Sequence, residues 1–503
     1  MINASLTIDP HFTVGDVNRR LFGSFVEHLG RCVYGGIYEP GHPTADAEGF
    51  RTDVADLIRE LGVSTIRYPG GNFVSGYRWE DGVGPREERP KRLDLAWHST
   101  ETNEIGLDEF ASWAAGVDSE LMYAVNLGTR GIDAALDVLE YANIPSGTFW
   151  SDRRIANGHP KPHNIRMWCL GNEMDGPWQV GHSTPEEYGR IAVKTARAMR
   201  QVDPDLELVV CGSSSAHMPT FGEWERIVLE ETYDEVDFIS CHAYYEPKND
   251  DFASFLASAV DMDRFIEAVI ATADHVKALR SSDKTLNISF DEWNVWYQSR
   301  YNEVDKITDV TAWPTAPRLL EDSYSVMDAV VFGNLLISLL RHADRVTAAS
   351  LAQLVNVIAP IMTEPGGISW RQTTFFPFAL TSQLAHGRSL EVRLEAPTYA
   401  SDAYGDVSLV DAVATHDDET GDAAVFLVNR SLTDEVTVQI DVSRLGDVSA
   451  VSAQTLHDDD IHARNTLDDP ERVGLKENSS ASVVDGIVSI TLPAVSWTAV
   501  TVR

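Results

Sequence analysis

The chain has 503 residues, of which 77 are acidic and 40 are basic, so its formal net charge at pH 7 is −37. A surface this acidic repels a nucleic-acid backbone and an anionic membrane, and neither is expected as a partner. The hydrophobic content of 43% is that of an ordinary globular protein, and the length allows either one large domain with a smaller one or two to four small domains.

The first twenty residues lack the basic start and apolar run of a secretory signal, so a cytoplasmic protein is expected. The longest apolar stretch, Ala329–Leu340, is interrupted by polar residues and is too short to cross a bilayer. We interpret it as a buried helix. Four cysteines are too few for a disulfide framework, and three of them lie in apolar, strand-like runs, which fits a reducing compartment.

Between residues 20 and 355, short runs rich in β-branched residues alternate with longer segments of helical period, as in βα units around a parallel sheet. The predicted strands are Leu21–Glu27, Val63–Tyr68, Leu121–Asn126, Ile165–Leu170, Leu206–Cys211, Val236–Cys241, Leu286–Phe290 and Val346–Leu351. Predicted helices between them include Asp53–Leu61, Leu107–Ala115, Pro185–Val202 and Ser323–Arg341. Eight strands with eight crossovers predict an α/β fold, a closed (β/α)₈ TIM barrel over residues 20–384.

From residue 385 the pattern changes to runs of period two, separated by acidic or turn residues. These runs are Val407–Val413, Ala423–Asn429, Glu435–Ile440, Val448–Leu456, Ile487–Leu492 and Trp497–Val502. They predict an antiparallel, jelly-roll-like β-sandwich over residues 385–503. The first run of the chain, Ala4–Ile8, lies in the segment 1–19 before the barrel and is expected to pair with that sheet.

Polar side chains stand at the ends of most predicted barrel strands, where enzymes of this architecture place their active sites. They are Glu27 and His28 after the first strand, Arg67 and Asn72 at the second, Asn126 at the third, Asn172 and Glu173 after the fourth, His242 and Tyr244 after the sixth, Glu292 after the seventh, and Gln353 after the eighth. Carboxylates, amides, a histidine and a tyrosine are therefore expected to meet on one rim.

Glu173 and Glu292 are the candidate catalytic pair. Glycosidic cleavage needs one carboxyl group to protonate the leaving oxygen while the opposite face of the sugar is attacked. Either residue alone could be a helix-entry residue or a solvated loop carboxylate, but the number of polar strand ends in register disfavours this. If the pair acts with retention, its carboxyl groups are expected about 5 to 5.5 Å apart.

Trp97 and Trp296 lie in the long loops after the second and seventh strands, where they either bind sugar faces or anchor local packing. His242 is expected to hydrogen-bond a carboxylate; the alternative is a satisfied core histidine. No metal centre is expected, because there is no His-x-His and prolines keep His159 and His163 off a common helix face. Nucleophile-elbow, phosphate-loop and dinucleotide-binding motifs do not occur.

Six motifs follow one another along the chain: Phe25–Arg31, Arg67–Asn72, Trp168–Glu173, His242–Tyr245, Asp291–Asn294 and Ala352–Asn356. Together they resemble the α-L-arabinofuranosidases of glycoside hydrolase family 51. The resemblance runs from about residue 2 to the C-terminus. An Asn-Glu pair after the fourth strand would by itself indicate only the wider clan of retaining barrel glycosidases, whereas the six motifs in this order are far more specific.

The resemblance implies a retaining exo-glycosidase without a cofactor that releases terminal α-L-arabinofuranosyl residues from arabinan, arabinoxylan or their oligosaccharides. Glu173 matches the family's general acid/base and Glu292 its nucleophile. The positions matching residues that bind the sugar or orient the nucleophile are Glu27, Asn72, Asn172, Tyr244 and Gln353, and Arg67 matches the arginine beside the nucleophile. Arg67 is expected to lower the pKa of Glu292, while Glu173 must keep a raised one. The family also implies an intracellular homo-hexamer.

Two other functions remain open at this point. A β-glycosidase or endo-glucanase could use the same scaffold, because the paired glutamates do not encode the sugar. A non-catalytic glycan-binding protein is the second alternative. The sequence leaves undetermined the natural substrate, the linkage, and the role of the loop Tyr301–Glu321, which is expected to border the leaving-group side.

Overall fold

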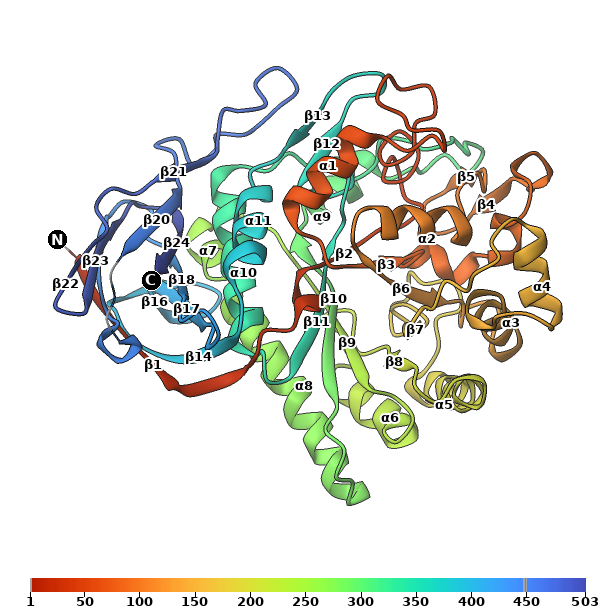
Figure 1. The fold of residues 1–503 in the computed structure, drawn as a ribbon, viewed down its shortest axis with the longest axis horizontal. Helices are drawn as coiled ribbons and strands as arrows, with labels where there is room; N and C mark the ends of the chain where they lie inside the picture. The colour runs from red at the N-terminus through yellow and green to blue at the C-terminus, as the bar shows by residue number, and fades with distance from the viewer. Residues whose placement is uncertain (1, 447, 449) are drawn as a thin grey trace.

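The computed structural model describes residues 2–446, 448 and 450–503. It consists of a barrel and a large sheet beside it (Figure 1). Eight parallel strands close the barrel in the order β10-β11-β2-β3-β6-β7-β8-β9. Their bounds are β2 (Gly23–Phe25), β3 (Thr65–Tyr68), β6 (Glu120–Val125), β7 (Met167–Leu170), β8 (Glu207–Val210), β9 (Phe238–Tyr245), β10 (Asn287–Val295) and β11 (Val346–Ala352). Each predicted run overlaps one of them, which confirms the (β/α)₈ barrel.

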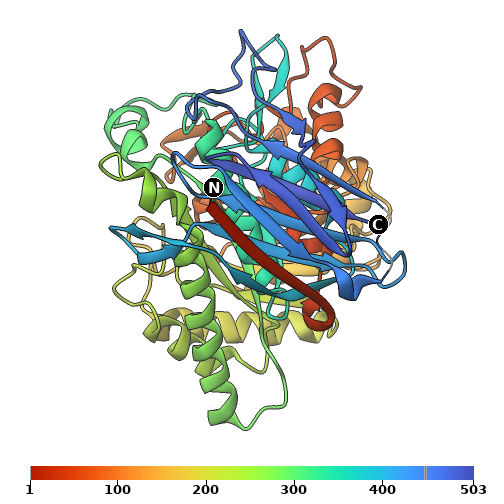
Figure 2. The same ribbon diagram turned by 90° about the vertical axis from the view of Figure 1, so that its left-hand side faces the viewer.

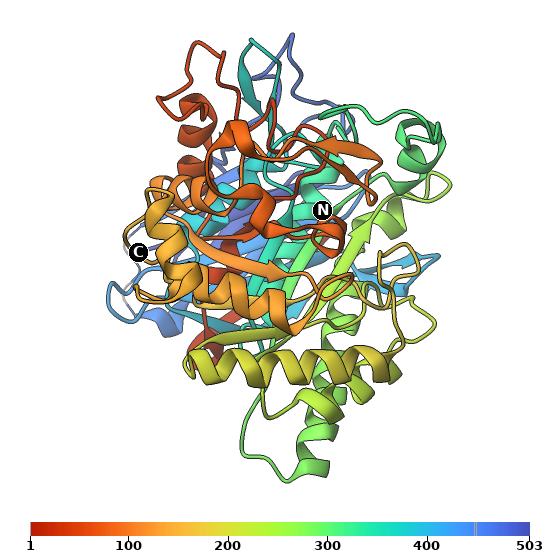
Figure 3. The same cartoon turned by 90° about the vertical axis from the view of Figure 1, so that its right-hand side faces the viewer.

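Helices alternate with these strands and cover the outside of the barrel, as the view from its far side shows (Figure 3). They are α1 (Thr52–Leu61), α2 (Leu107–Gly116), α3 (Ile132–Asn143), α4 (Phe149–Ala156), α5 (Pro185–Val202), α6 (Glu223–Thr232), α7 (Phe252–Leu256), α8 (Ala259–Arg280), α9 (Gln298–Arg300), α10 (Val326–Arg341) and α11 (Phe375–Leu384). Helix α5 begins where predicted, because the Thr184 hydroxyl accepts the Glu187 N–H and Pro185 occupies the first turn.

Several βα loops carry small elements of their own. The hairpin β4 (Arg92–Asp94) and β5 (Ser99–Glu101) lies between β3 and α2, and the hairpin β12 (Ile361–Thr363) and β13 (Ser369–Arg371) follows β11. The short helical turns are η1 (Arg19–Phe22), η2 (Asn72–Gly76), η3 (Trp79–Gly82), η4 (Arg86–Glu88), the π-helical η5 (Tyr301–Asp305) and η6 (Ser443–Leu445). The insertions between β3 and α2 and those after β10 and β11 build up one end of the barrel, where the candidate site lies, whereas η1 precedes β2 and η6 lies between β19 and β20 of the large sheet.

The large sheet has ten strands in the order β21-β20-β24-β18-β17-β14-β1-β19-β23-β22. Their bounds are β1 (Ile2–Asp16), β14 (Arg388–Glu395), β17 (Val410–His416), β18 (Ala423–Asn429), β19 (Val436–Asp441), β20 (Val451–Leu456), β21 (Leu475–Glu477), β22 (Ser482–Val484), β23 (Ile487–Leu492) and β24 (Ser496–Val502). Figure 2 shows β1 crossing this sheet in red. It pairs antiparallel with β14 and parallel with β19, and the other strand pairs of the sheet are antiparallel.

One predicted strand of this region is divided in the structure. The run Val407–Val413 breaks at Leu409, so that β16 (Gly405–Ser408) pairs with β15 (Thr398–Ser401) in a separate hairpin while β17 enters the large sheet. Strands from both ends of the large sheet contribute to one apolar core, among them β1, β18, β19 and β23. This common core confirms the predicted sandwich-like domain.

Helix α10 lies between the barrel and the sheet and contacts β17, β18 and β24. Its position explains why the segment is apolar on all sides, since 15 of its 16 residues are buried. A Cβ atom at Gly333 would lie 2.3 Å from Trp497, so glycine is what lets β24 approach the helix. The prediction of a buried helix here is confirmed.

A network of ion pairs connects α10, which lies between the barrel and the large sheet, with α8 and β17. Arg341 of α10 pairs with Asp263 of α8 at 2.6 Å and with Asp411 of β17, and Arg430 pairs with Asp411 at 2.6 Å. Burial raises the pKa of Asp411, but the two arginines outweigh it and lower that pKa to about 2. We call Asp263, Arg341, Asp411 and Arg430 the junction network.

The four cysteines are free and buried, as expected from their apolar surroundings. Across the part of the chain that the structure describes, none of the helices combines the length and the apolar character needed to cross a bilayer.

Candidate active site

The carboxyl ends of the barrel strands bring the predicted site residues together. Arg67 lies in β3, His242 and Tyr244 in β9, and Glu292 in β10, while Glu27, Glu173 and Gln353 come shortly after β2, β7 and β11. The side chains of Glu27, Glu173, His242, Glu292 and Gln353 are all buried. Charged groups taken out of water in this way are costly unless they are paired, so their partners define the chemistry of the site.

Glu173 and Glu292 face each other across one imidazole nitrogen. Nδ1 of His242 lies 2.8 Å from Glu173 Oε1 and 3.6 Å from Glu292 Oε2. One carboxylate oxygen of each glutamate and a ring nitrogen of His242 all lie within 4.8 Å of one another. The two carboxyl groups predicted to act together are therefore neighbours.

His242 is held on both sides, since its Nε2 atom lies 2.8 Å from Asp291 Oδ1. Burial lowers the pKa of His242, but the charge of Glu292 and the hydrogen bonds with Asp291 and Glu173 outweigh it and raise that pKa to about 10. At neutral pH His242 is therefore a cation among three carboxyl groups. The expectation that it bonds a carboxylate agrees with this geometry.

Two side chains fix the orientation of Glu292. Arg67 Nη1 donates to its Oε1 atom at 2.8 Å, and the Tyr244 hydroxyl donates to its Oε2 atom at 2.7 Å. Burial raises the pKa of Glu292, and the charges of His242 and Arg67 act against that rise. The expected lowering by Arg67 is thus present as one contribution, but the expected net direction was wrong because desolvation is the larger effect.

Glu27 accepts three hydrogen bonds at the far side of the site. They come from the Phe73 N–H at 2.8 Å, from Trp97 Nε1 at 2.7 Å and from Gln353 Nε2 at 3.2 Å. Burial raises the pKa of Glu27 well above its usual range, against the hydrogen bonds from Trp97 and Phe73. Trp97 is itself buried, so it holds Glu27 with its ring edge instead of exposing a face.

The remaining predicted residues lie beside these groups at the same end of the barrel. Arg67 Nη2 donates to Asn172 Oδ1 at 2.7 Å, and Asn172 Nδ2 in turn donates to Asn72 Oδ1 at 3.3 Å. Trp296 packs edge-on against Tyr244, with ring centroids 5.0 Å apart. Asn72 and Trp296 are half-buried, which leaves them within reach of a bound molecule.

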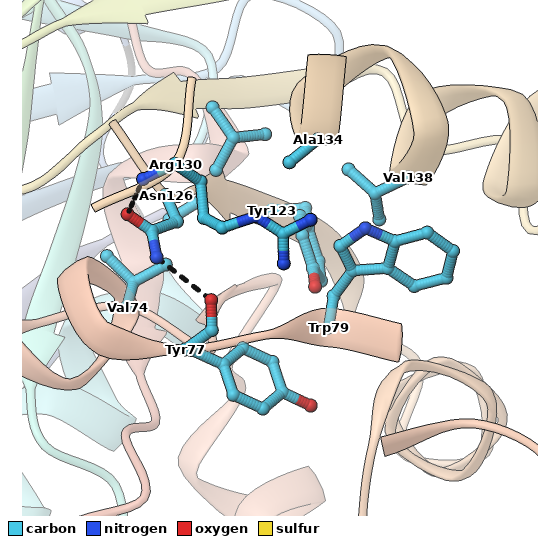
Figure 4. Close-up of a pocket in the computed structure, with 10 residues that line it drawn as sticks. Val74, Tyr77, Trp79, Tyr123, Asn126, Arg130, Ala134 and Val138 are labelled. Carbon is cyan, nitrogen blue, oxygen red and sulfur yellow. Dashed lines mark hydrogen bonds between the residues drawn. The ribbon is translucent and has the colours of Figure 1, made fainter. Parts of the chain in front are cut away.

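Two rim residues of the sequence prediction do not reach this site. Asn126 donates to the Tyr77 carbonyl at 2.9 Å and caps its own loop. Together with Trp79 and Arg130 it lines a separate small pocket between β6 and α3 (Figure 4). His28 is buried behind the site, where its two ring nitrogens lie 2.9 Å from Glu101 and 2.7 Å from the Tyr68 hydroxyl.

The structure adds Trp178, which sequence reasoning missed, and gives a role to Asp291, which the sequence placed beside Glu292 without one. Trp178 Nε1 donates to Glu173 Oε2 at 2.7 Å, although 51% of this side chain is exposed. Asp291 precedes Glu292 and would point away from it in a regular strand, but the register of β10 shifts between Ser289 and Glu292. Such a bulge allows two consecutive side chains to serve one site. The Asp-Glu pair after an apolar run was the available signal.

The group of Glu173, His242 and Glu292 is compact enough to be considered as a metal site. The donor set argues against it. Both ring nitrogens of His242 are engaged with carboxylates, and a protonated imidazole offers no lone pair to a metal ion.

Comparison with known proteins identifies the family. Residues 57–305 match the family described as Alpha-L-arabinofuranosidase 1 domain, and residues 291–496 match Alpha-L-arabinofuranosidase C-terminal domain. An intracellular exo-α-(1→5)-L-arabinofuranosidase of Streptomyces lividans is 60% identical over 99% of this chain and 75% of its own. An exo-α-(1→6)-L-arabinofuranosidase of Bifidobacterium longum is also 60% identical, over 99% of this chain and 97% of its own.

A solved structure agrees with these relatives. The family 51 α-L-arabinofuranosidase from Bifidobacterium longum superimposes with a TM-score of 0.96 at 51% identity and covers 100% of both chains. An α-L-arabinofuranosidase from Thermotoga maritima, in complex with arabinose, has a TM-score of 0.88 at 32% identity and covers 99% of both chains. The chain therefore belongs to the α-L-arabinofuranosidases of glycoside hydrolase family 51.

Proposed function

We propose that this protein is an intracellular, retaining exo-α-L-arabinofuranosidase. It removes terminal non-reducing α-L-arabinofuranosyl residues from arabinan, arabinoxylan or their oligosaccharides, without a metal ion or other cofactor. The observation that carries the proposal is the close approach of Glu173 and Glu292, whose nearest oxygens lie within 4.8 Å. An inverting enzyme needs about 6.5 to 9.5 Å between its carboxyl groups to admit a water molecule.

In the first step Glu292 attacks the anomeric carbon while the bond to the leaving oxygen breaks and Glu173 gives that oxygen its proton. Arg67 and Tyr244 each hold one oxygen of Glu292, so the nucleophile meets the sugar in a single orientation. Asn172 lies directly before Glu173 and is placed to bind the 2-hydroxyl group, a contact that strengthens as positive charge develops on the sugar.

In the second step Glu173 is ionised and takes a proton from a water molecule. The oxygen of that water attacks the anomeric carbon, and the bond to Glu292 breaks. His242 stays cationic throughout, because Asp291 holds its second nitrogen, and it stabilises the negative charge that moves between the two glutamates. Glu27 and Gln353 bind hydroxyl groups farther from the anomeric carbon.

Hydrolysis of 4-nitrophenyl α-L-arabinofuranoside, followed by proton NMR, tests the proposal. We expect rapid release of 4-nitrophenol with the α-anomer of arabinose appearing first. Early appearance of the β-anomer would exclude retention. An intact glycoside with shortened polymers would indicate an endo-enzyme, and an intact glycoside with bound oligosaccharide would indicate a glycan-binding protein.

The linkage and the assembly need separate measurements. The two relatives at 60% identity are named for different linkages, 1→5 and 1→6, so initial rates on both arabinobioses are compared. The homo-hexamer implied by the family is part of the proposal. Sedimentation should give a species of six times the 55.6 kDa chain mass, and a stable monomer or dimer would remove this part.

A further inference from the structure

Tyr301 packs between two tryptophans of the site at the start of the loop Tyr301–Glu321. Its ring centroid lies 6.0 Å from that of Trp97 and 5.9 Å from that of Trp296. Trp97 holds Glu27, and Trp296 contacts Tyr244, which holds Glu292. We call the three rings of Trp97, Tyr301 and Trp296 the aromatic wall.

The strand order locates the aromatic wall. Trp296 directly follows β10, and Trp97 is bonded to Glu27, which follows β2; β11 lies between these two strands in the closed barrel. Glu173 follows β7, which is four strands from β11 in either direction around the barrel. The wall and the proposed acid therefore stand on opposite sides of the mouth. The start of the loop therefore lies away from the proposed acid, and the expectation that the loop Tyr301–Glu321 borders the leaving-group side stays a prediction for the rest of it.

The proposed reaction orients the sugar between these two sides. Glu173 must reach the glycosidic oxygen, so the leaving group lies on the side of β7. The hydroxyl groups on C3 and C5 of the bound arabinofuranose then face β11 and β2. A further arabinose residue of an arabinan chain would be attached through one of those hydroxyl groups. The aromatic wall occupies the space that this residue would need.

We propose that Tyr301 determines exo action: its ring closes the gap between Trp97 and Trp296 and excludes a second sugar residue at the non-reducing end. This inference rests on the proposed arabinofuranosidase function. The backbone fixes the ring, because the Tyr301 N–H donates to the Tyr297 carbonyl at 3.1 Å and the Lys306 N–H donates to the Tyr301 carbonyl at 2.9 Å.

The Tyr301 hydroxyl adds a polar contact to this barrier. It has no hydrogen-bond partner within residues 2–446, 448 and 450–503, and the residue is half-buried. Burial and the nearby charge of Glu27 raise the pKa of Tyr301 to about 12, so it remains a donor at working pH. A terminal hydroxyl group satisfies this donor, whereas a substituted one must displace the ring.

The test uses a 4-nitrophenyl α-L-arabinofuranoside that carries a second α-L-arabinofuranosyl group on O5. The unmodified enzyme should release arabinose first. Tyr301→Ala should release arabinobiose and 4-nitrophenol together, with the initial rate of arabinobiose formation rising by roughly tenfold or more, because steric exclusion by one side chain is of that order. Chromatography of the first products distinguishes the two routes.

Three variants make the result decisive. Tyr301→Phe retains the ring and should release arabinose only, and Val304→Ala, on the same turn with 71% of its side chain exposed, should behave as the unmodified enzyme. Tyr301→Val serves if the alanine variant does not fold. The inference is overturned if the alanine or valine variant cleaves the unsubstituted glycoside but forms no arabinobiose, or if Tyr301→Phe forms it too. An unmodified enzyme inactive on the unsubstituted glycoside would instead refute the proposed function.

Discussion

Two of the charge networks in the described part of the chain differ in their numbers of acidic and basic groups. The site network sets three carboxyl groups against two cations: Glu173, Asp291 and Glu292 with Arg67 and His242. The junction network sets two against two: Asp263 and Asp411 with Arg341 and Arg430. The site network is buried, whereas in the junction network Asp411 and Arg430 are buried and Arg341 and Asp263 are half-buried. The buried charges depend on their partners.

The ratio of carboxyl groups to cations determines whether the carboxyl groups of each network stay ionised. Asp411 has a pKa lowered to about 2 and stays ionised, whereas burial raises the pKa of Glu292 despite the cations beside it. The surplus carboxyl group gives the site room for one proton, which a general acid must hold before it can donate it. The site also holds Glu173 at a φ of 43°, a left-handed conformation that costs a residue with a Cβ about 1–2 kcal/mol. The junction network stabilises the folded protein, whereas the arrangement of the site lowers the stability of the fold and provides the groups for catalysis.

The largest effect is expected for Glu292→Ala in the site network. Without the nucleophile no covalent intermediate can form, so kcat should fall by roughly 10⁴-fold or more on every substrate. Added azide should restore part of the activity from the vacated face and yield the inverted glycosyl azide, which NMR identifies. A variant that keeps half its activity and does not respond to azide would remove Glu292 from this role.

Glu173→Ala should have an effect that depends on the leaving group. Loss of general-acid assistance costs about 10²- to 10⁴-fold on alkyl glycosides and arabino-oligosaccharides, whose leaving oxygen needs a proton. Activated aryl arabinosides should lose much less in the first step. If kcat/KM fell equally for both classes, another group would be the acid.

Asp411→Ala tests the other side of the comparison. It leaves the buried Arg430 without its carboxylate partner and the half-buried Arg341 with Asp263 alone, so the free energy of unfolding should drop by about 3 kcal/mol in urea titrations. The kcat/KM of the folded fraction should not change. Glu395→Ala removes an exposed ion pair, with side chains 80% and 66% accessible, and should shift stability by less than about 0.5 kcal/mol.

The junction network also predicts a pH dependence. The pKa of Asp411 is depressed from 3.8 to about 2, so its stabilising effect is complete above pH 3.8 and is lost as pH falls through 2. Asp411→Asn should remove this part of the acid unfolding curve. An unchanged slope between pH 4 and 2 would show that the carboxylate does not contribute to stability there.

Among the three site variants, Tyr244→Phe should have the smallest effect on the reaction. It removes one hydrogen bond to a charged carboxylate, which is worth about 1.5–3 kcal/mol, so kcat should fall by roughly 10- to 100-fold with little change in Tm. A lowered Tm with unchanged kcat/KM would mean that Tyr244 only closes the barrel mouth.

Much of the barrel and of the candidate site could be predicted from the sequence. The barrel strands are buried on both faces and read as continuous apolar runs, and parallel strands all end on one side, so the residues after them meet. Glu173, Glu292 and His242 could therefore be predicted to lie close together from the sequence alone. The same reasoning also included Asn126, because a strand end alone does not show whether a side chain turns inward or caps its own loop.

The misses have a common physical origin. Asp291 enters the site through a register shift in β10, and bulges leave no periodic trace in a sequence. Trp178 reaches the site from an irregular loop and Tyr301 from the short π-helical turn η5, and the packing of both segments depends on distant partners. The net direction of the pKa of Glu292 depends on desolvation, which exists only once the whole site has assembled.

The position of β1 has a consequence for biosynthesis. This strand is synthesised before the barrel, whereas its two neighbours, β14 and β19, follow the barrel in the sequence. During translation both hydrogen-bonding edges of β1 remain unpaired until the ribosome has completed the barrel and synthesised β14 and β19. Exposed strand edges of this kind favour association between chains. The speed of elongation and the access of chaperones to the nascent N-terminus should therefore influence the yield of soluble enzyme more than the folding of the barrel itself.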